Sequence, residues 1–297
     1  MGDAPNERSL HRTVIPRFGG LGILLGTGIG LALAGEPAPS FWLVAAYVAL
    51  ALVSALDDRR SIAAPVRLAV HLLTAAAWTA TLGLPLVWSA LIVAGLVWSA
   101  NLFNFMDGAD GLAGAMAVIG LAALGWVAAQ GGSDTGWAIA RACFVLSAAV
   151  MGFLVFNFPP ARLFLGDSGS IPLGFVAGAF GVQGALAGLW SPLFPLIVFF
   201  PFVFDATFTL GSRLARGRSP LQAHREHLYQ RAILAGLSHR QMTLRACAMM
   251  LAGAAAAIAV RNFPYWTHFL IIGLQAVIGA VLSVRIARKD AMEGEKA

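Results

Sequence analysis

The chain has 297 residues, of which 59% are hydrophobic and only 11% are charged, and its mean hydropathy is +0.78. A soluble globular domain carries about 25% charged residues, so this composition excludes a soluble protein and indicates an integral membrane protein. The net charge of +6 requires no nucleic-acid partner, because basic residues retained on the cytoplasmic side of a membrane protein produce the same excess.

Hydrophobic runs follow one another along the whole chain. A transmembrane helix takes about 20 apolar residues, so these runs predict an all-α, polytopic integral membrane helix bundle of about ten transmembrane helices. The predicted helices cover residues 18–34, 41–56, 66–82, 84–103, 112–130, 137–156, 171–190, 193–212, 242–260 and 266–284. No fixed-period repeat is present, so residues 1–297 are expected to form a single polytopic membrane domain.

The basic residues set the expected orientation. With the N-terminus in the cytoplasm, all of the 20 Lys and Arg residues except Arg141 and Arg261 lie on or near the cytoplasmic side. Lys and Arg are retained on that side, so both termini are predicted to be cytoplasmic. Cys143 and Cys247 fall inside predicted helices, and no disulfide is expected between them.

An aspartate pair, Asp57-Asp58, ends the second predicted helix. Adjacent carboxylates repel each other, so one of them tends to hold a proton or to be neutralised by a cation. The pair is therefore a candidate general base or metal site. A solvated cluster of loop charges explains the same residues, and the pair alone leaves both interpretations open.

The connection after the fourth predicted helix is rich in amides and carboxylates. It contains Asn101, Asn104, Asp107 and Asp110, and a glycine follows each aspartate. Such glycines suit tight turns and let backbone N–H groups approach a ligand. Because the two aspartates lie three residues apart, their carboxylates can converge on one cation. A polar membrane-edge loop with helix-capping aspartates is the alternative interpretation.

A second polar connection runs from Asn157 to Ser170 and contains the tetrapeptide Gly-Asp-Ser-Gly, residues 166–169. Chymotrypsin-like proteases contain the same tetrapeptide, but they are β-barrels, and no stretch here alternates with the period of two that a strand needs. The flanking glycines instead predict a sharply turned carboxylate at Asp167 that is presented to a ligand, with Phe164 beside it as a stacking surface.

The last polar features are Asp205, inside the eighth predicted helix, and the long basic connection after it. A carboxylate within a span usually faces a water-filled cavity or the bundle interior, but a bond to Arg213 or to a helix end explains Asp205 equally well. Arginine binds phosphate through paired donors and imidazole adds another, so the basic connection resembles a pyrophosphate-binding surface. Its basic and imidazole side chains are Arg213, Arg216, Arg218, His224, Arg225, His227, Arg231, His239 and Arg240.

Six of the nine aspartates belong to segments that approach the same predicted cytoplasmic face: Asp57, Asp58, Asp107, Asp110, Asp167 and Asp205. Clustered carboxylates can hold Mg²⁺ while arginines hold phosphates, which predicts phosphoryl transfer between a soluble nucleotide and a lipid phosphate. The alternative is a membrane transporter or lipid flippase that handles an anionic substrate. Such proteins tend to place charges near the bilayer midplane, whereas these charges gather at one face.

Four motifs, in the same order, resemble the polyprenyl-phosphate N-acetylhexosamine-1-phosphate transferase superfamily, glycosyltransferase family 4, over nearly the full chain. The CDP-alcohol phosphotransferases are not matched, because they need DG-x-x-AR and Asp107-Gly108 is not followed by it. The motifs are a lead-in with Pro5-Asn6, Arg8-Ser9, His11, Pro16 and Gly19-Gly20; the pair Asp57-Asp58; the run N-x-x-N-x-x-DG-x-DGLAG from Asn101 to Gly114; and the run from Asn157 through Pro160-Ala161 to Phe164-Leu165-Gly166-Asp167-Ser168-Gly169-Ser170.

The resemblance implies transfer of N-acetylhexosamine-1-phosphate from a UDP-sugar to undecaprenyl phosphate or another polyprenyl phosphate, with release of UMP. It places the enzyme in the inner (cytoplasmic) membrane with its active-site loops in the cytoplasm. It also implies Mg²⁺ as cofactor, with Mn²⁺ as a substitute, and a homodimer is a further expectation.

The resemblance also assigns roles to individual residues. The carboxylates do the metal and acceptor chemistry: Asp167 and Asp107 hold the metal, and Asp57 and Asp58 engage the lipid phosphate. The remaining residues bind the nucleotide sugar: Asn104 supports the metal and diphosphate, Asp110 and Phe164 hold the uracil, Asn157 belongs to the matched substrate-site segment, and His227, Arg225 and Arg231 contact the diphosphate.

The basic connection departs from the usual family pattern. A histidine cluster is usual there, but Tyr229 and Gln230 stand where histidines are often found. This resembles the branch that initiates O-antigen synthesis in lipopolysaccharide, and it points away from an N-acetylmuramoyl-pentapeptide substrate. The expected donor is therefore UDP-GlcNAc or a 6-deoxy sugar nucleotide such as UDP-FucNAc or UDP-QuiNAc.

Overall fold

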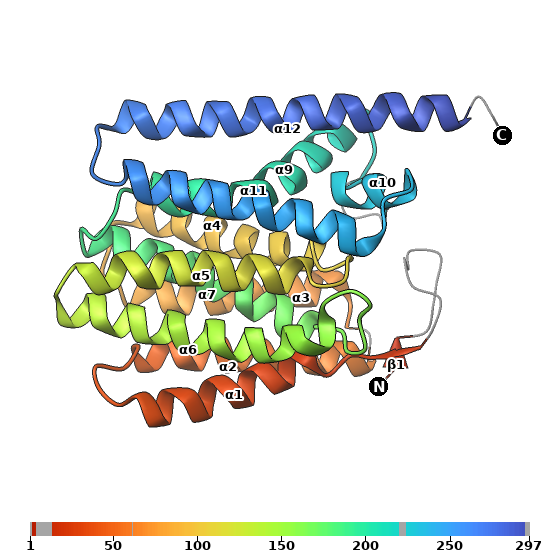
Figure 1. Ribbon diagram of the computed structural model, residues 1–297. Helices are drawn as coiled ribbons and strands as arrows, with labels where there is room; N and C mark the ends of the chain where they lie inside the picture. Colours follow the sequence, from red (N-terminus) through yellow and green to blue (C-terminus); the bar gives the residue numbers. More distant parts are fainter. Residues whose placement is uncertain (1, 4–13, 61, 220–223, 295–297) are drawn as a thin grey trace.

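The computed structural model describes residues 2–3, 14–60, 62–219 and 224–294. The predicted lead-in motif from Pro5 to His11 lies outside these residues. The described chain is almost entirely helical, which confirms the all-α prediction (Figure 1). Its helices are α1 (Gly19–Ala34), α2 (Phe41–Arg60), α3 (Ala64–Ala80), α4 (Leu86–Phe105), α5 (Leu112–Gln130), α6 (Asp134–Asn157), α7 (Asp167–Leu186), α8 (Leu193–Val198), α9 (Phe200–Ala215), α10 (Leu228–Leu234), α11 (His239–Val260) and α12 (Tyr265–Gly294). Two short antiparallel strands, β1 (Gly2–Asp3) and β2 (Ile15–Pro16), precede α1.

The count of about ten transmembrane helices is not confirmed. Every predicted segment is helical, but only seven helices of the described residues are long and apolar enough to cross a bilayer: α2, α4, α5, α6, α7, α11 and α12. Helices α1 and α3 are shorter, with 16 and 17 residues. The eighth predicted segment is divided at Phe199 into α8 and α9, and Pro201 in the first turn of α9 has no N–H to donate to the turn before it.

Helices α5 and α7 form the centre of the bundle. In each, 72% of the apolar window is buried, against 11% in α12, which lies along one edge (Figure 1). Small residues let α7 approach its neighbours closely: Gly174 packs against α4, where a Cβ would lie 2.4 Å from the carbonyl oxygen of Ser99. The Ser99 hydroxyl donates a 2.7 Å hydrogen bond to the Gly174 carbonyl and so fixes this contact.

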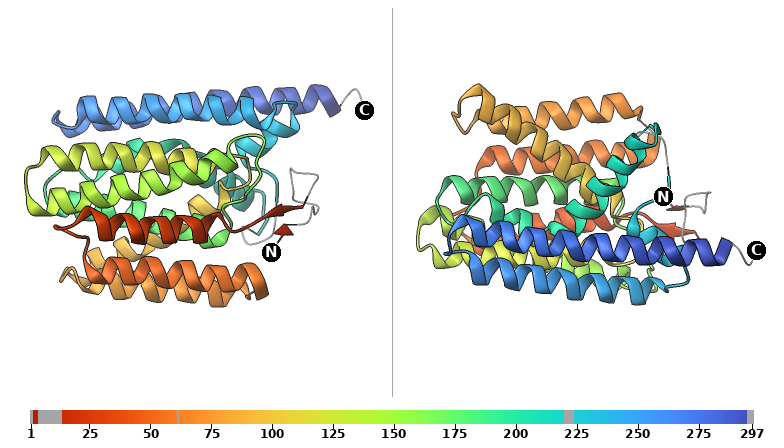
Figure 2. Two further views of the ribbon diagram at one scale, coloured as in Figure 1. Left: turned by 60° about the horizontal axis from the view of Figure 1, so that its bottom comes forward. Right: turned by 90° about the horizontal axis from the view of Figure 1, so that it is seen from above.

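One end of the bundle gathers most of the polar connections. This polar end contains β1, α10, the C-terminal ends of α2, α4, α6 and α12, and the N-terminal ends of α5, α7 and α11, and α9 runs obliquely toward it (Figures 1 and 2). The first strand and the last helix therefore lie at the same end, as the predicted orientation requires. That this end faces the cytoplasm stays a prediction.

Candidate active site

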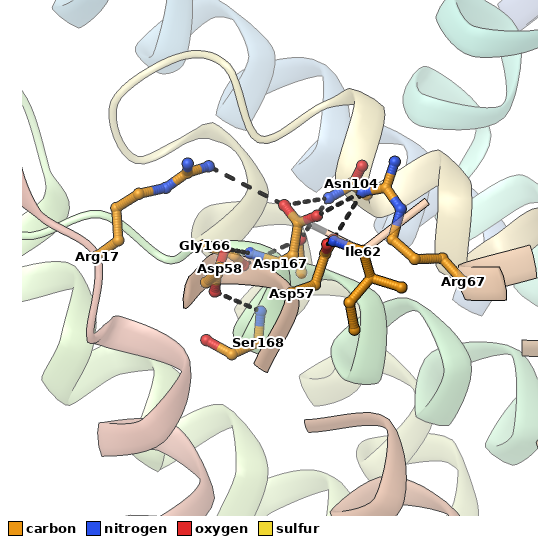
Figure 3. Close-up of polar contacts among 10 residues, drawn as sticks. Arg17, Asp57, Asp58, Ile62, Arg67, Asn104, Gly166, Asp167 and Ser168 are labelled. Carbon is orange, nitrogen blue, oxygen red and sulfur yellow. Dashed lines mark hydrogen bonds and ion pairs between the residues drawn. The ribbon is translucent and has the colours of Figure 1, made fainter. Parts of the chain in front are cut away.

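Four aspartates from three segments meet at the polar end. Asp57 and Asp58 come from the last turns of α2, Asp107 from the loop between α4 and α5, and Asp167 from the start of α7. We call these four residues the aspartate cluster; Figure 3 shows three of them with their partners. The helices turn back at this end of the bundle, so residues far apart in the sequence become neighbours here.

Asp167 contacts three side chains of the described residues. The Asn104 amide donates a 2.9 Å hydrogen bond to its Oδ1, and Arg67 Nη1 lies 3.3 Å from its Oδ2. Arg17 Nη2 lies 4.0 Å from Oδ1, and Asn104 also donates to the hydroxyl of Ser170 at 3.2 Å (Figure 3). The carboxylate is thus oriented from two sides by cations and by an amide.

Asp58 caps the start of α7. The backbone N–H groups of Asp167 and Ser168 donate to its two carboxylate oxygens at 3.4 and 3.2 Å. A negative charge is favourable at a helix N-terminus, where the first N–H groups have no partner within the helix. Gly166 lies at φ +72°, and a Cβ there would come within 3.0 Å of Asp58 Oδ2. The Asp58 carboxylate is therefore held against the turn that presents Asp167.

Asp57 points toward α3 instead. It is buried. One carboxylate oxygen accepts a 2.5 Å hydrogen bond from the N–H of Ile62, and the other forms a 2.8 Å ion pair with Arg67. The same arginine nitrogen also contacts Asp167, so Arg67 joins two carboxylates of the cluster. The adjacent aspartates thus avoid mutual repulsion by turning to different partners.

Asp107 completes the cluster. Burial raises the pKa of Asp107 well above its usual range, and the charges of Asp167 and Asp58 raise it further, while Arg17 and a hydrogen bond from Gly166 lower it. A cation placed between Asp107 and its acidic neighbours would therefore stabilise the ionised form of this carboxyl.

The donor set fits Mg²⁺ in the way this ion usually binds enzymes. Mg²⁺ prefers oxygen ligands and takes one or two carboxylates together with substrate phosphates and water. Asp107 and Asp167 provide two carboxylates with mutual repulsion to relieve. Within the described part of the chain no three His, Cys, Asp or Glu side chains form a metal cage, so substrate phosphates and water would complete the coordination.

Asp110 and Asn157 form a second polar network next to the cluster. Asp110 accepts a 3.0 Å bond from the N–H of Ala161 and lies 3.1 Å from His239 Nδ1. Buried Asn157 accepts from the N–H of Gly111 at 2.9 Å and donates to the carbonyl of Leu163 at 2.8 Å. These bonds fix the α6–α7 connection to the start of α5, so both residues have a structural role beside any role in binding.

Half-buried Phe164 lies in that connection. Its N–H donates to the carbonyl of Pro16 at 2.8 Å, and its carbonyl accepts from the N–H of Gly19 at 3.0 Å. The backbone of the predicted stacking residue is therefore attached to the segment that brings Arg17 to the cluster.

Asp205 explains the placement of α10. Its buried carboxylate accepts from the backbone N–H groups of Leu228 and Tyr229 at 2.9 and 3.1 Å and from the Thr209 hydroxyl at 3.2 Å. His227 Nδ1 lies 3.2 Å from the same carboxylate. Of the explanations open from the sequence, the bond to a helix end is the one found, and no described contact joins Asp205 to Arg213.

Helix α10 in turn supports the loop that carries Asp107. The Tyr229 hydroxyl donates to the carbonyl of Phe105 at 3.0 Å, and a Cβ on Gly108 would lie 2.2 Å from that hydroxyl. The His227 ring stacks on Phe105 with centroids 5.9 Å apart. Predicted residue His227 is therefore placed beside the α4–α5 loop, by Asp205 on one side and by Phe105 on the other.

The arginines of the basic connection are placed differently. Arg225 and Arg231 line a cavity between α9, α10 and α12. Burial and the charges of His227 and Arg213 lower the pKa of His224 to about 4. His224 is thus neutral at pH 7, as its Nδ1 requires in order to accept the N–H of Glu226 at 3.3 Å.

Three residues of the site were not assigned from the sequence: Arg17, Arg67 and Tyr229. Arg67 follows the aspartate pair by ten residues, across a turn that a helix-period pattern does not resolve. Arg17 adjoins the glycine pair at the start of α1. Tyr229 stood out only as a replacement for histidine, and nothing local indicates that its hydroxyl reaches a carbonyl 124 residues away.

The chain is similar in sequence to known proteins. The family model described as "Glycosyl transferase family 4" matches residues 40–185, a range that contains the whole aspartate cluster. A probable undecaprenyl-phosphate N-acetylglucosaminyl 1-phosphate transferase of Bacillus subtilis is 29% identical, and the alignment covers 95% of this chain and 83% of the relative. An undecaprenyl-phosphate alpha-N-acetylglucosaminyl 1-phosphate transferase of Yersinia pestis is 30% identical over 84% of this chain and 75% of the relative. A decaprenyl-phosphate N-acetylglucosaminephosphotransferase of Mycolicibacterium smegmatis is 29% identical over 81% of this chain and 70% of the relative.

Proposed function

The chain belongs to glycosyl transferase family 4, and from this membership and the aspartate cluster we propose that it transfers N-acetylglucosamine-1-phosphate from UDP-GlcNAc to a polyprenyl phosphate and releases UMP. The activities for which the relatives are named support this donor and this class of acceptor. A 6-deoxy sugar nucleotide such as UDP-FucNAc or UDP-QuiNAc is the second donor to test, and initiation of O-antigen synthesis is the finer role that it would indicate.

The observation that carries the proposal is the meeting of four carboxylates with Arg17 and Arg67 at one end of a membrane bundle. We place this end in the cytoplasm, at the inner membrane, where a soluble nucleotide sugar can meet a lipid. A transporter or flippase is not favoured, because Asp205 serves as a helix cap and the other carboxylates avoid the middle of the bundle. Nothing in a single chain or in the relatives supports the expected homodimer.

The reaction joins two anions, so positive charge must be in place before they approach. Arg17 and Arg67 supply part of it beside Asp167. Mg²⁺ (or Mn²⁺ in its place), held by Asp167 and Asp107 with Asn104 in support, would neutralise the charge that develops on the diphosphate. His227 faces the α4–α5 loop and is our candidate for a diphosphate contact. Arg225 and Arg231 share that role only as a prediction from the sequence.

We propose direct displacement. An oxygen of the lipid phosphate attacks the phosphorus that bears the sugar, the bond from that phosphorus to the UMP oxygen breaks, and UMP leaves with the electron pair. Asp57 and Asp58 position the lipid phosphate or accept its proton. The rival is a double displacement in which a carboxylate of the cluster attacks first and carries the sugar phosphate covalently.

Purified protein is expected to release UMP from UDP-GlcNAc only when undecaprenyl phosphate is present, because no covalent intermediate forms without the acceptor. UMP release is measured with UDP-GlcNAc, UDP-FucNAc and UDP-QuiNAc in parallel, and labelled UMP is followed into UDP-sugar with the acceptor rigorously removed. Absence of UMP release with every donor would contradict the proposed function. Acceptor-free exchange at a rate near kcat would leave the function standing but overturn direct displacement.

A second expected result concerns the uracil. Removing a charged hydrogen-bond partner costs about 1.5–3 kcal/mol, so Asp110→Ala should raise the KM for UDP-GlcNAc about tenfold to a hundredfold. Phe164→Ala should weaken UMP binding through lost stacking. Binding of UMP is measured by calorimetry beside the KM.

The matched control is His239→Gln. It removes the imidazole that lies beside Asp110 but keeps the carboxylate, so it tests whether loosening the loop alone raises the KM. Unchanged UMP binding in both Asp110→Ala and Phe164→Ala would place the base elsewhere.

A further inference from the structure

A cavity of about 800 Å³ lies between α9, α10 and α12, apart from the aspartate cluster. Among the described residues that line it, the polar side carries four arginines and one carboxylate, that of Glu226. The arginines are Arg216, Arg218, Arg225 and Arg231.

Glu226 cannot balance this charge. It already pairs with buried Arg213, which does not line the cavity, and it accepts from Arg216 at 2.6 Å and from Arg218 at 3.3 Å. Arg216 and Arg218 nevertheless remain half exposed, at 50% and 56%. Among the described side chains of the cavity, positive charge therefore exceeds negative charge, which suits an anion with several acceptor oxygens, such as a phosphate.

The opposite side of the cavity is apolar. Phe208 of α9 and Val284 and Ala287 of α12 line it, and Phe208 and Val284 are 42% and 51% exposed. Farther along α12, Val277 and Val281 continue the exposed apolar surface away from the polar end. Exposed apolar side chains next to an arginine group match an amphiphile, whose head is anionic and whose tail is hydrocarbon.

The segment from Arg225 to Leu228 divides the cavity from the aspartate cluster. Arg225, Glu226 and Leu228 line the cavity, whereas His227 points to Asp205 and stacks on Phe105 beside the α4–α5 loop. A phosphate in the cavity therefore has none of the four clustered carboxylates beside it. The arrangement favours a resident lipid over the reacting acceptor.

We propose that this cavity binds the phosphate head group of an anionic glycerophospholipid of the bilayer, with an acyl chain lying along α9 and α12. Arg216 and Arg218 contact the phosphate in place of, or together with, Glu226. The bound lipid lies against the segment that carries His227, so it stabilises the placement of that side chain from outside the reaction site.

Binding of phosphatidylglycerol to the full chain in detergent tests the proposal, with phosphatidylcholine as the neutral lipid and native mass spectrometry as the readout. Basic side chains near a lipid surface attract anionic lipids, so removing two arginines should weaken binding about thirtyfold. The variant Arg216→Gln/Arg218→Gln is therefore expected to lose phosphatidylglycerol while its retention of phosphatidylcholine stays unchanged. Ala287→Trp, which fills the cavity without changing its charge, should also weaken binding.

The matched control is Arg162→Gln, another exposed arginine of the polar end, which lies over Phe156 and outside the cavity. It should bind phosphatidylglycerol as the unchanged chain does.

Equal binding by the double variant and the unchanged chain would overturn the proposal. Displacement by millimolar inorganic phosphate would identify a soluble-anion site instead. Displacement by undecaprenyl phosphate, with a raised KM for that acceptor in the double variant, would identify an acceptor site. No nucleotide sugar is used in the binding measurement. A negative result for lipid binding therefore does not bear on the proposed transferase activity.

Discussion

Replacing Asp167 by asparagine is expected to lower turnover by about three orders of magnitude or more and to remove the response to Mg²⁺, because stabilisation of developing charge is worth several kcal/mol. Asp167 is the carboxylate on which Asn104, Arg67 and Arg17 converge. Asparagine keeps the size of the side chain and one acceptor oxygen, so α7 should still start at the same place. UMP release across a Mg²⁺ titration measures the effect.

Two comparison variants make this result specific. Asp58→Asn should still bind Mg²⁺ and UDP-GlcNAc, measured by calorimetry, because Asp58 caps α7 and its proposed role is toward the lipid phosphate. Asp134→Asn changes an aspartate in the first turn of α6, at the other end of the bundle, and should leave turnover unaltered. Normal Mg²⁺ binding by Asp167→Asn would move the metal site to other residues.

Replacing Asp205 by alanine should be nearly as damaging, although this residue does not reach the reacting atoms. The change leaves two backbone N–H groups and His227 without their buried partner, which costs about 3–5 kcal/mol. Helix α10 has only seven residues, so this loss is expected to open it locally and leave the rest of the bundle folded. Turnover should fall about a hundredfold or more, and hydrogen exchange of residues 228–234 should accelerate.

Thr209→Val is the matched control for that experiment. It removes one of the four partners of the Asp205 carboxylate but leaves the helix cap intact, so turnover should change less than about tenfold. Slow exchange of α10 in Asp205→Ala, together with normal turnover, would show that α10 is placed by its other contacts.

The sequence predicted the aspartates of the site better than the side chains that contact them. The four clustered aspartates were predicted from their spacing, from the glycines beside them and from their place at the ends of apolar segments. Their partners come from other segments: Arg67 lies across a turn and Tyr229 at the far side of a long basic connection. Such contacts depend on how the helices pack, and no local pattern records that packing.

The helices show the same division between local and tertiary information. Hydrophobicity located every apolar segment because burial and bilayer insertion depend on the same side chains. It did not predict the break between α8 and α9, since proline is compatible with an apolar run but not with an unbroken hydrogen-bond ladder. The basic residues predicted a shared end for both termini, and the first strand and the end of α12 do lie there.

The contact between Tyr229 and Phe105 gives the site an order of assembly during synthesis. The four aspartates are all translated by residue 167, whereas Asp205 and Tyr229, which place α10 against the Asp107 loop, emerge later. N-terminal segments enter the membrane and pack first. A ribosome-bound chain that has inserted α1 to α7 thus already carries the acidic residues but lacks the Tyr229 and His227 contacts that support the Asp107 loop from α10. We therefore expect the site to become active only when the C-terminal third of the polypeptide has packed against the bundle.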